Sequence, residues 1–223
     1  MRTRKITSEE RAGCRSIVLI SGRGTNLQAL INEAPRLGFT IELIISSKAG
    51  AFGLERAKKH QIPFKILEHQ FFDSREDFDE ALSIIIDEKN PDLIVLAGFM
   101  RILGKKFVQH FHGRMLNIHP SLLPKYPGIN THQRALDAGD DIHGVTVHFV
   151  TEDMDGGPII AQESIKISPY ETGETLAKRT LKIEHTLYPK IVNLFASGRL
   201  TMKDGEAMLD NKIIAPKNNQ FNS

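Results

Sequence analysis

Two side chains that could act on one reacting atom stand close together near the middle of the chain. Asn117 and His119 lie in the stretch MLNIHPSLLPKYPG, residues 115–128. Residues 115–118 are predicted to form a short strand, on which side chains two positions apart point to the same face. Pro120 favours an extended backbone at His119. An amide donor beside a titratable imidazole suits catalysis, although a buried amide next to a surface histidine fits the spacing equally well.

A glycine-containing loop, residues 21–26, offers a second kind of chemistry after the first predicted strand. Gly24 allows a tight turn, and Thr25 and Asn26 add polar side chains where a predicted helix begins. Free amides at a helix N-terminus bind phosphate well. Leu27 replaces the third glycine of a dinucleotide loop, the second strand ends without a ribose-binding acid, and the P-loop motif is absent. The loop therefore favours a phosphate monoester, with a plain tight turn as the alternative.

Acidic residues gather in a third segment, residues 151–157, which reads TEDMDGG. A carboxylate that lies near His119 would favour the charged imidazolium form. Ligands of open α/β sheets bind beyond the carboxyl ends of the strands, where such a loop would lie. The acidic ladder of an EF-hand calcium loop does not follow. The alternative to a functional carboxylate is therefore a solvated turn.

The elements that must position these side chains alternate along the chain. Continuous apolar runs are separated by helix-like segments, which is typical of a parallel sheet covered on both faces. After residue 112 this rhythm changes, and Val145, Val147 and Phe149 share one face of a later strand. We therefore predict an α/β fold with a mostly parallel central sheet, helices on both faces and a mixed C-terminal part. The predicted strands are 16–21, 40–46, 63–67, 92–98, 114–118, 144–150 and 158–167, and the predicted helices are 25–35, 51–60, 75–89, 131–138 and 172–196.

Two of these helices carry clear end signals. Ser74 is a good N-cap for the helix over residues 75–89. Pro189 lies inside the predicted helix 172–196, where we expect it to kink the helix or to end its first part.

The composition disfavours several classes of function. The 223 residues carry a net charge of +2 with a pI near 8.6, which gives no argument for binding nucleic acid or a membrane surface. We identify no apolar run long enough to span a bilayer and no secretory signal. Cys14 is the single cysteine, so neither an internal disulfide nor a cysteine-rich metal site is expected. This cysteine usage suits a cytoplasmic protein.

Several longer motifs resemble, in the same order, those of the folate-dependent glycinamide ribonucleotide formyltransferases. They are VLISGRGTNLQALI (18–31), LAGFMRIL (96–103), MLNIHPSLLPKYPG (115–128), HGVTVHFVTEDMDGGPII (143–160) and IEHTLYP (183–189). The resemblance implies a Rossmann-like formyltransferase fold with a single formyltransferase domain over 15–200. The N-terminal half of this domain would bind the phosphate-bearing substrate, and the C-terminal half would complete the folate site. Residues 1–14 would form an N-terminal extension and residues 201–223 a C-terminal tail.

The resemblance also implies the reaction, which belongs to de novo purine biosynthesis. The amine of glycinamide ribonucleotide attacks the formyl carbon of 10-formyltetrahydrofolate directly and passes through a tetrahedral intermediate. The products are formylglycinamide ribonucleotide and tetrahydrofolate. The folate is a formyl-donor co-substrate, and no metal is implied. The expected partners are these two small molecules, without nucleic acid or membrane, and the expected assembly is a monomer or homodimer.

Each matching residue takes an implied role from the resemblance. Asn117, His119 and Asp155 match the catalytic trio. Some relatives have glutamine at the position of Leu181, so no polar contact is implied there. We expect His132, His143 and His148 to be structural or surface residues. The ribonucleotide-binding positions are Gly24, Thr25, Asn26 and Glu184, and the folate-binding positions are Arg75, Met100, Arg101, Ile102, Leu103, Asn117, Thr151, Glu152, Asp153, Met154 and Asp155.

Four rival functions are less favoured. Methionyl-tRNA formyltransferase would need a further C-terminal domain and a basic face. Formyltetrahydrofolate hydrolase usually has an N-terminal regulatory domain. The missing ribose-binding acid argues against a nucleotide-dependent oxidoreductase, and the pair Asn117 and His119 argues against a non-catalytic phosphate-binding module.

Overall fold

Within residues 13–214, which this computed structural model describes, seven strands form one sheet in the order β3-β2-β1-β4-β5-β6-β7. The first five strands of the chain run parallel, and β6 and β7 pair antiparallel with their neighbours. The predicted α/β fold with a mostly parallel sheet is therefore confirmed. The strands are β1 Cys14–Ile20, β2 Phe39–Ser46, β3 Phe64–Ile66, β4 Leu93–Leu96, β5 Met115–His119, β6 Ile142–Phe149 and β7 Ile159–Lys166.

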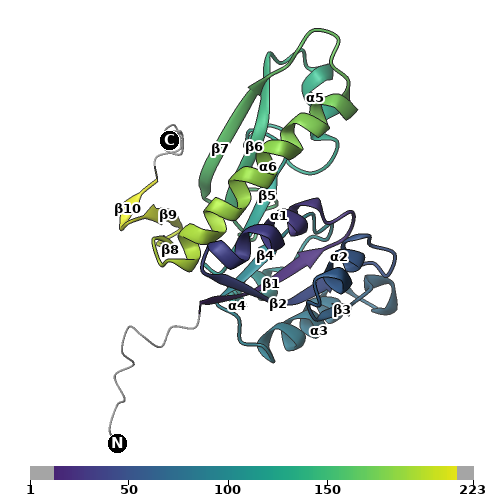
Figure 1. Ribbon diagram of the computed structural model, residues 1–223, viewed down its shortest axis with the longest axis vertical. Coiled ribbons are helices and arrows are strands. Elements are labelled where there is room, and N and C mark those ends of the chain that lie inside the picture. The colour runs from purple at the N-terminus through teal and green to yellow at the C-terminus, as the bar shows by residue number, and fades with distance from the viewer. Residues whose placement is uncertain (1–12, 215–223) are drawn as a thin grey trace, which may run out of the picture.

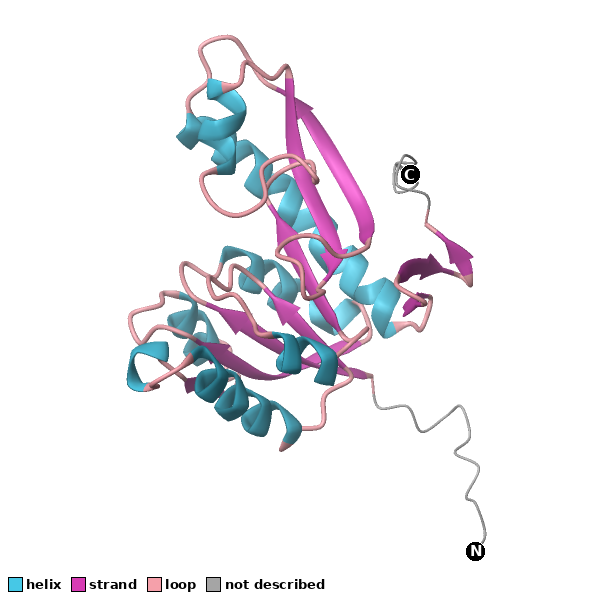
Figure 2. Cartoon of the chain, turned by 180° about the vertical axis from the view of Figure 1, so that it is seen from behind, coloured by secondary structure: helices cyan, strands magenta, loops and turns pink. Residues whose placement is uncertain are grey.

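Helices cover both faces of this sheet, as Figures 1 and 2 show. Successive residues of β1 point to opposite faces, so Val18 and Ile20 pack in one apolar cluster and Ile17 and Leu19 in another. The first cluster includes residues of α1, α2 and α6, and the second includes residues of α3 and α4. The helices are α1 Thr25–Glu33, α2 Gly53–Lys59, α3 Arg75–Asp87, α4 Lys105–His110, α5 Thr131–Asp137 and α6 Gly173–Ala196, with 3₁₀ turns at Ala34–Arg36 and His69–Phe71.

The two local signals predicted from the sequence, the Ser74 cap and the effect of Pro189, can be compared with the observed helices. Ser74 caps α3 as predicted, since its Oγ accepts a hydrogen bond from the backbone N–H of Asp77. The prediction that Pro189 ends the first part of the last helix is wrong, because α6 continues through it. A proline inside a helix costs about 3 kcal/mol. The fully buried side chains of Leu187 and Tyr188 beside it offset this cost.

Tyr188 also joins α6 to the middle of the sheet. Its side chain is completely buried, and its hydroxyl lies 2.9 Å from the carbonyl oxygens of Leu96 and Leu116. These carbonyls belong to the neighbouring strands β4 and β5. Since a buried hydroxyl needs a hydrogen-bond partner, this contact fixes how the helix sits on the two strands.

The sheet changes from parallel to antiparallel pairing at β5, and this register gathers polar side chains. Across the antiparallel pair of β5 and β6, Asn117 is opposite His148, and His119 is opposite Thr146. Residues that are opposed in this way have neighbouring side chains on one face of the sheet. The predicted catalytic residues of β5 therefore receive neighbours from β6.

Residues 200–213, most of which belong to the predicted C-terminal tail, form a second sheet. Its strands are β8 Leu200–Lys203, β9 Glu206–Leu209 and β10 Lys212–Ile213. Leu200 and Ala207 are buried in the cluster that includes α6. The rest of the predicted extension and tail, residues 1–12 and 215–223, falls outside the described residues. No helix between residues 13 and 214 is long and apolar enough to cross a bilayer.

Candidate active site

The main candidate site is a cavity of about 800 Å³ beyond the carboxyl ends of β4 and β5. This volume is typical of small-molecule sites. Its lining comes from the loop after β4, the end of β5 with the following loop, the turn after β6, and single residues of α1 and α6. Gly24, Thr25 and Arg75 are not part of this lining. The predicted site residues that line it are Asn26, Met100, Arg101, Ile102, Leu103, Asn117, His119, Thr151, Glu152, Asp153, Met154, Asp155 and Glu184.

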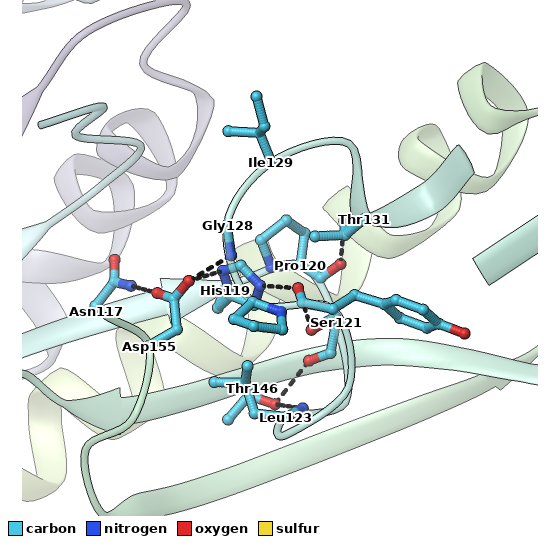
Figure 3. A network of polar contacts seen from close by, with 12 residues as sticks. Asn117, His119, Pro120, Ser121, Leu123, Gly128, Ile129, Thr131, Thr146 and Asp155 are labelled. Atoms are coloured by element: carbon cyan, nitrogen blue, oxygen red, sulfur yellow. Dashed lines mark hydrogen bonds and ion pairs between the residues drawn. The ribbon is translucent and has the colours of Figure 1, made fainter. Parts of the chain in front are cut away.

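Asn117, His119 and Asp155 all line this cavity, and Figure 3 shows their side chains beside one another. His119 Nδ1 lies 3.4 Å from Asp155 Oδ2, and Asn117 Nδ2 lies 3.5 Å from Asp155 Oδ1. The other ring nitrogen of His119, Nε2, lies 2.8 Å from the carbonyl oxygen of Tyr126, to which it donates. This contact holds the buried ring and directs Nδ1 toward the carboxylate.

His148 belongs to the same polar group, whereas a structural or surface role is expected for it from the sequence. Its Nε2 lies 3.1 Å from Asn117 Nδ2 and 3.8 Å from Asp155 Oδ1. Its Nδ1 donates to the carbonyl oxygen of Phe149, so Nε2 accepts the amide hydrogen of Asn117. Burial lowers the pKa of His148, which favours this neutral form. The alternation along β6 could have placed His148 on the polar face, but only the antiparallel pairing brings it to Asn117.

The loop of residues 120–130 closes one side of the cavity and is held by polar contacts. Ser121 Oγ donates to the carbonyl oxygen of Lys125 at 2.6 Å. The backbone N–H of Gly128 donates to Asp155 Oδ2 at 2.8 Å, a contact also visible in Figure 3. One carboxylate oxygen of Asp155 therefore contacts both this loop and the ring of His119.

Asn26 and Glu184 come from distant parts of the sequence and form one buried pair. Asn26 Nδ2 donates to Glu184 Oε2 at 2.6 Å. Burial raises the pKa of the Glu184 carboxyl, and the hydrogen bond from Asn26 opposes this shift. Asn26 Oδ1 is buried and has no partner among the residues that the structure describes. This end of the cavity can therefore accept hydrogen bonds from a ligand.

The glycine loop lies at the start of α1. Gly24 is the N-cap with φ of 66°, and a Cβ there would lie 2.6 Å from the Cα of Gly53. Thr25 lines a separate cavity of about 260 Å³ together with Arg56. Arg56 Nε also donates to the carbonyl oxygen of Arg23 at 3.0 Å. A cation beside the free amides of a helix N-terminus suits an anion.

The residues predicted to bind folate include an exposed apolar wall. Met100, Ile102 and Met154 form this wall and are 64, 55 and 54% exposed. The backbone N–H of Met100 donates to Ser21 Oγ at 2.8 Å, which ties the folate segment (residues 100–103) to the end of β1. Arg75 is the exposed first residue of α3 and does not line the main cavity.

His132 lines the main cavity, whereas His143 is buried behind it. His132 Nε2 lies 2.8 Å from Thr180 Oγ1 on α6, and the two histidine rings are 5.0 Å apart. Burial lowers the pKa of His132 to about 4, and the nearby His143 and His119 add to this shift. The ring is therefore neutral near pH 7. No group of three or more His, Cys, Asp or Glu side chains within residues 13–214 could hold a metal ion.

Comparisons with known proteins agree with this geometry. The family described as "Formyl transferase" matches residues 14–192. A phosphoribosylglycinamide formyltransferase of Escherichia coli (strain K12) is 47% identical, over 90% of this chain and 96% of that protein. The solved structure of a phosphoribosylglycinamide formyltransferase from Coxiella burnetii has a TM-score of 0.88 and 51% identity, and the match covers 92% of this chain and 97% of that one. The chain therefore belongs to the formyl transferase family and, within it, to the phosphoribosylglycinamide formyltransferases.

Proposed function

We infer that this chain transfers the formyl group of 10-formyltetrahydrofolate to the amine of glycinamide ribonucleotide in purine biosynthesis. The products are formylglycinamide ribonucleotide and tetrahydrofolate. One observation carries the assignment of the site: Asn117, His119 and Asp155 meet between a polar end of the main cavity and an apolar wall. Membership of the family supports the same reaction.

The polar end, with Asn26 and Glu184, is proposed to bind the ribonucleotide. Glu184 and the free Oδ1 of Asn26 accept hydrogen bonds from the ribose hydroxyls. The amides at the start of α1, at Gly24 and Thr25, bind the phosphate with the help of the helix dipole. This arrangement directs the amine of the substrate toward the centre of the cavity.

The apolar wall and the folate segment are proposed to bind the formyl donor, whose role is to present an activated formyl group. Met100, Ile102 and Met154 cover the flat ring system of the folate. The backbone of residues 98–103 forms hydrogen bonds with the polar edge of this ring system. Thr151 and the acidic residues of the turn that follows it also line the cavity. Arg75 remains a sequence-based prediction, since its side chain does not line the cavity.

Asn117 and His119 are proposed to stabilise the negative charge that develops on the formyl oxygen. Attack by the amine moves the carbonyl electron pair onto this oxygen. Asn117 Nδ2 and His119 Nδ1 both face the region beside Asp155, so a protonated His119 and the amide can donate to one oxygen there. One well-placed donor lowers such a barrier by about 3 kcal/mol.

Asp155 is proposed to hold the charged His119 and to relay a proton. Its Oδ2 lies 3.4 Å from His119 Nδ1. In the overall reaction the formyl carbon gains a bond to the substrate amine and loses its bond to the folate nitrogen. The amine must lose a proton and the folate nitrogen must gain one, and a carboxylate at this position moves it through water.

The decisive experiment offers 10-formyltetrahydrofolate together with one of three acceptors: glycinamide ribonucleotide, formyl-accepting tRNA or water. We expect tetrahydrofolate to form rapidly only with the ribonucleotide. Faster transfer to tRNA, or hydrolysis of the donor at a similar rate, would contradict the proposed function. A dephosphorylated substrate should bind much more weakly, and equal affinity would remove the phosphate role of the glycine loop.

The assembly and location of the chain remain proposals as well. We propose a monomer or homodimer; the balanced charge argues against partners such as nucleic acid or a membrane, and the single cysteine supports the cytoplasm. Light scattering should give a mass of 25.0 kDa or twice this value. Cell fractionation should recover the protein with cytoplasmic enzymes, and recovery with membranes would contradict this proposal.

A further inference from the structure

Asp79 is a buried carboxylate that lies behind the folate segment and not in the cavity. It belongs to α3, is 6% exposed and does not line the cavity. Its Oδ2 accepts a hydrogen bond from the backbone N–H of Gly104 at 2.6 Å. Gly104 follows residues 100–103 directly and precedes α4. The carboxylate therefore holds the chain at the end of the segment that lines the cavity.

Gly104 indicates that this contact depends on close approach. Its φ is −77°, which any residue adopts, so the backbone conformation does not require glycine. A Cβ at this position would lie 2.8 Å from Asp79 Oδ2. Any other residue would therefore press against the carboxylate oxygen that accepts the Gly104 N–H. The glycine makes room for Asp79.

Two arginines of the predicted folate site surround the same carboxylate. Burial raises the pKa of Asp79, and the Gly104 N–H and the charges of Arg75 and Arg101 oppose this shift. Asp79 Oδ1 and Arg101 Nε are both buried, and each lacks a hydrogen-bond partner within residues 13–214. Such unpaired groups cost about 1–3 kcal/mol each.

We propose that Asp79 is a positioning residue for the formyl donor. It holds the folate segment through the backbone of Gly104 and through the charge that it presents to Arg101. Asp79 touches neither substrate, so its loss acts on the donor only through the position of residues 100–103. The ribonucleotide end, with Asn26 and Glu184, is left unchanged. This inference rests on the proposed folate site.

Steady-state kinetics of Asp79→Ala and Asp79→Asn separate the two substrates. We expect D79A to raise the KM for 10-formyltetrahydrofolate about tenfold, which corresponds to about 1.4 kcal/mol. The kcat and the KM for the ribonucleotide should stay within about twofold. D79N keeps an oxygen that can accept the Gly104 N–H but loses the charge, so its effect should be smaller. Glu80→Gln, an exposed neighbour on α3, is the matched control and should change nothing.

A double-mutant cycle tests whether Asp79 acts through Gly104. Gly104→Ala alone should also raise the donor KM, because the new Cβ displaces the carboxylate. The double variant Asp79→Ala/Gly104→Ala should have a donor KM no higher than that of the more affected single variant. In the double variant the carboxylate oxygen that the new Cβ would meet is absent. Fully additive effects would contradict this route.

The inference is overturned if folded Asp79 variants keep the donor KM, or if both KM values rise equally. Circular dichroism and thermal unfolding establish whether the variants are folded. If D79A does not fold, the donor KM values of D79N and G104A provide the test. If the unchanged protein transfers no formyl group from the folate donor, the proposed function fails, and not the role of Asp79 alone.

Discussion

The proposed ribonucleotide end and the proposed folate end of the main cavity are built in different ways. At the first, Asn26 and Glu184, 158 residues apart, already bind each other through buried polar atoms. At the second, Met100, Ile102 and Met154 leave more than half of their surface exposed. Fixed polar acceptors select a ligand by its hydrogen bonds, whereas an exposed apolar wall gains affinity by being covered. If the proposed sites are correct, specificity for the acceptor is preformed in the free protein, whereas affinity for the donor comes from covering the apolar wall.

Removing the centre between the two ends should have the largest effect. His119→Ala should lower kcat by about 10²- to 10³-fold, because it removes an electrostatic donor to the formyl oxygen. Both KM values should change little, since neither end depends on the ring. Steady-state kinetics measure this, with the exposed His112→Ala as control. Near-normal turnover would remove His119 from the mechanism.

The next largest effect should come from the preformed end. Glu184→Gln keeps an oxygen that can accept from Asn26 but removes the charge, so the KM for the ribonucleotide should rise about tenfold with the donor KM unchanged. Lys190→Gln, exposed on the same helix, is the control. A rise in the donor KM instead would break the distinction between the two ends.

The same variant should stabilise the free protein at high pH. The pKa of Glu184 is raised in the folded state above the ordinary value of 4.5. Its protonated form therefore supports folding below this value, and that support is lost as pH rises through the folded pKa. Glutamine cannot ionise, so Glu184→Gln should have a higher Tm than the unchanged protein at pH 8 and a smaller advantage at pH 4. A lower Tm at pH 8 would show that the charge stabilises the free protein.

Changes in the apolar wall should be smaller and should concern the donor alone. Met100→Ala or Ile102→Ala should raise the donor KM by about fivefold, which corresponds to about 1 kcal/mol of lost burial. The Tm should hardly change, because both side chains are exposed in the free protein. Phe71→Ala, also exposed but outside the cavity, is the control. A lower Tm with an unchanged donor KM would mean that the wall serves the fold.

The smallest expected effect is the pH response of His132, beside the preformed end. Its pKa of about 4 lies below the ordinary 6.5, so the neutral ring favours the folded state. That stability is complete above pH 6.5 and is lost as pH falls through about 4. His132→Gln should therefore flatten the dependence of Tm on pH in this window. A ring that titrates near 6.5 by NMR would contradict the prediction.

Features that depend on the spacing of neighbouring residues could be predicted from the sequence. The shared face of Asn117 and His119 follows from the two-residue period of a strand, and Ser74 signals a helix start through its own side chain. The parallel sheet follows from long apolar runs between helices. Each of these signals is contained within a few consecutive residues.

Features that depend on contacts between distant segments could not be predicted from the sequence. His148 meets Asn117 only because β5 and β6 pair antiparallel in one register. The six residues of α4 are too few to show a helical period. Of the two effects expected of Pro189, only the end of the helix is contradicted, because burial around the proline, which no local pattern shows, outweighs its local cost. The roles of the site residues came from the resemblance, since spacing alone left each of them open.

The contact of Tyr188 with two strands fixes the position of α6, and therefore of the α6 residues that line the site. A helix turns about 100° and rises about 1.5 Å per residue, so Glu184 and Tyr188 stand almost one above the other on one side of the helix. Tyr188 fixes the helix against Leu96 and Leu116, and Glu184 then reaches Asn26. One residue inserted between them would turn Glu184 away from the cavity. The spacing of four residues between Glu184 and Tyr188 therefore matters as much to the site as the identity of either residue.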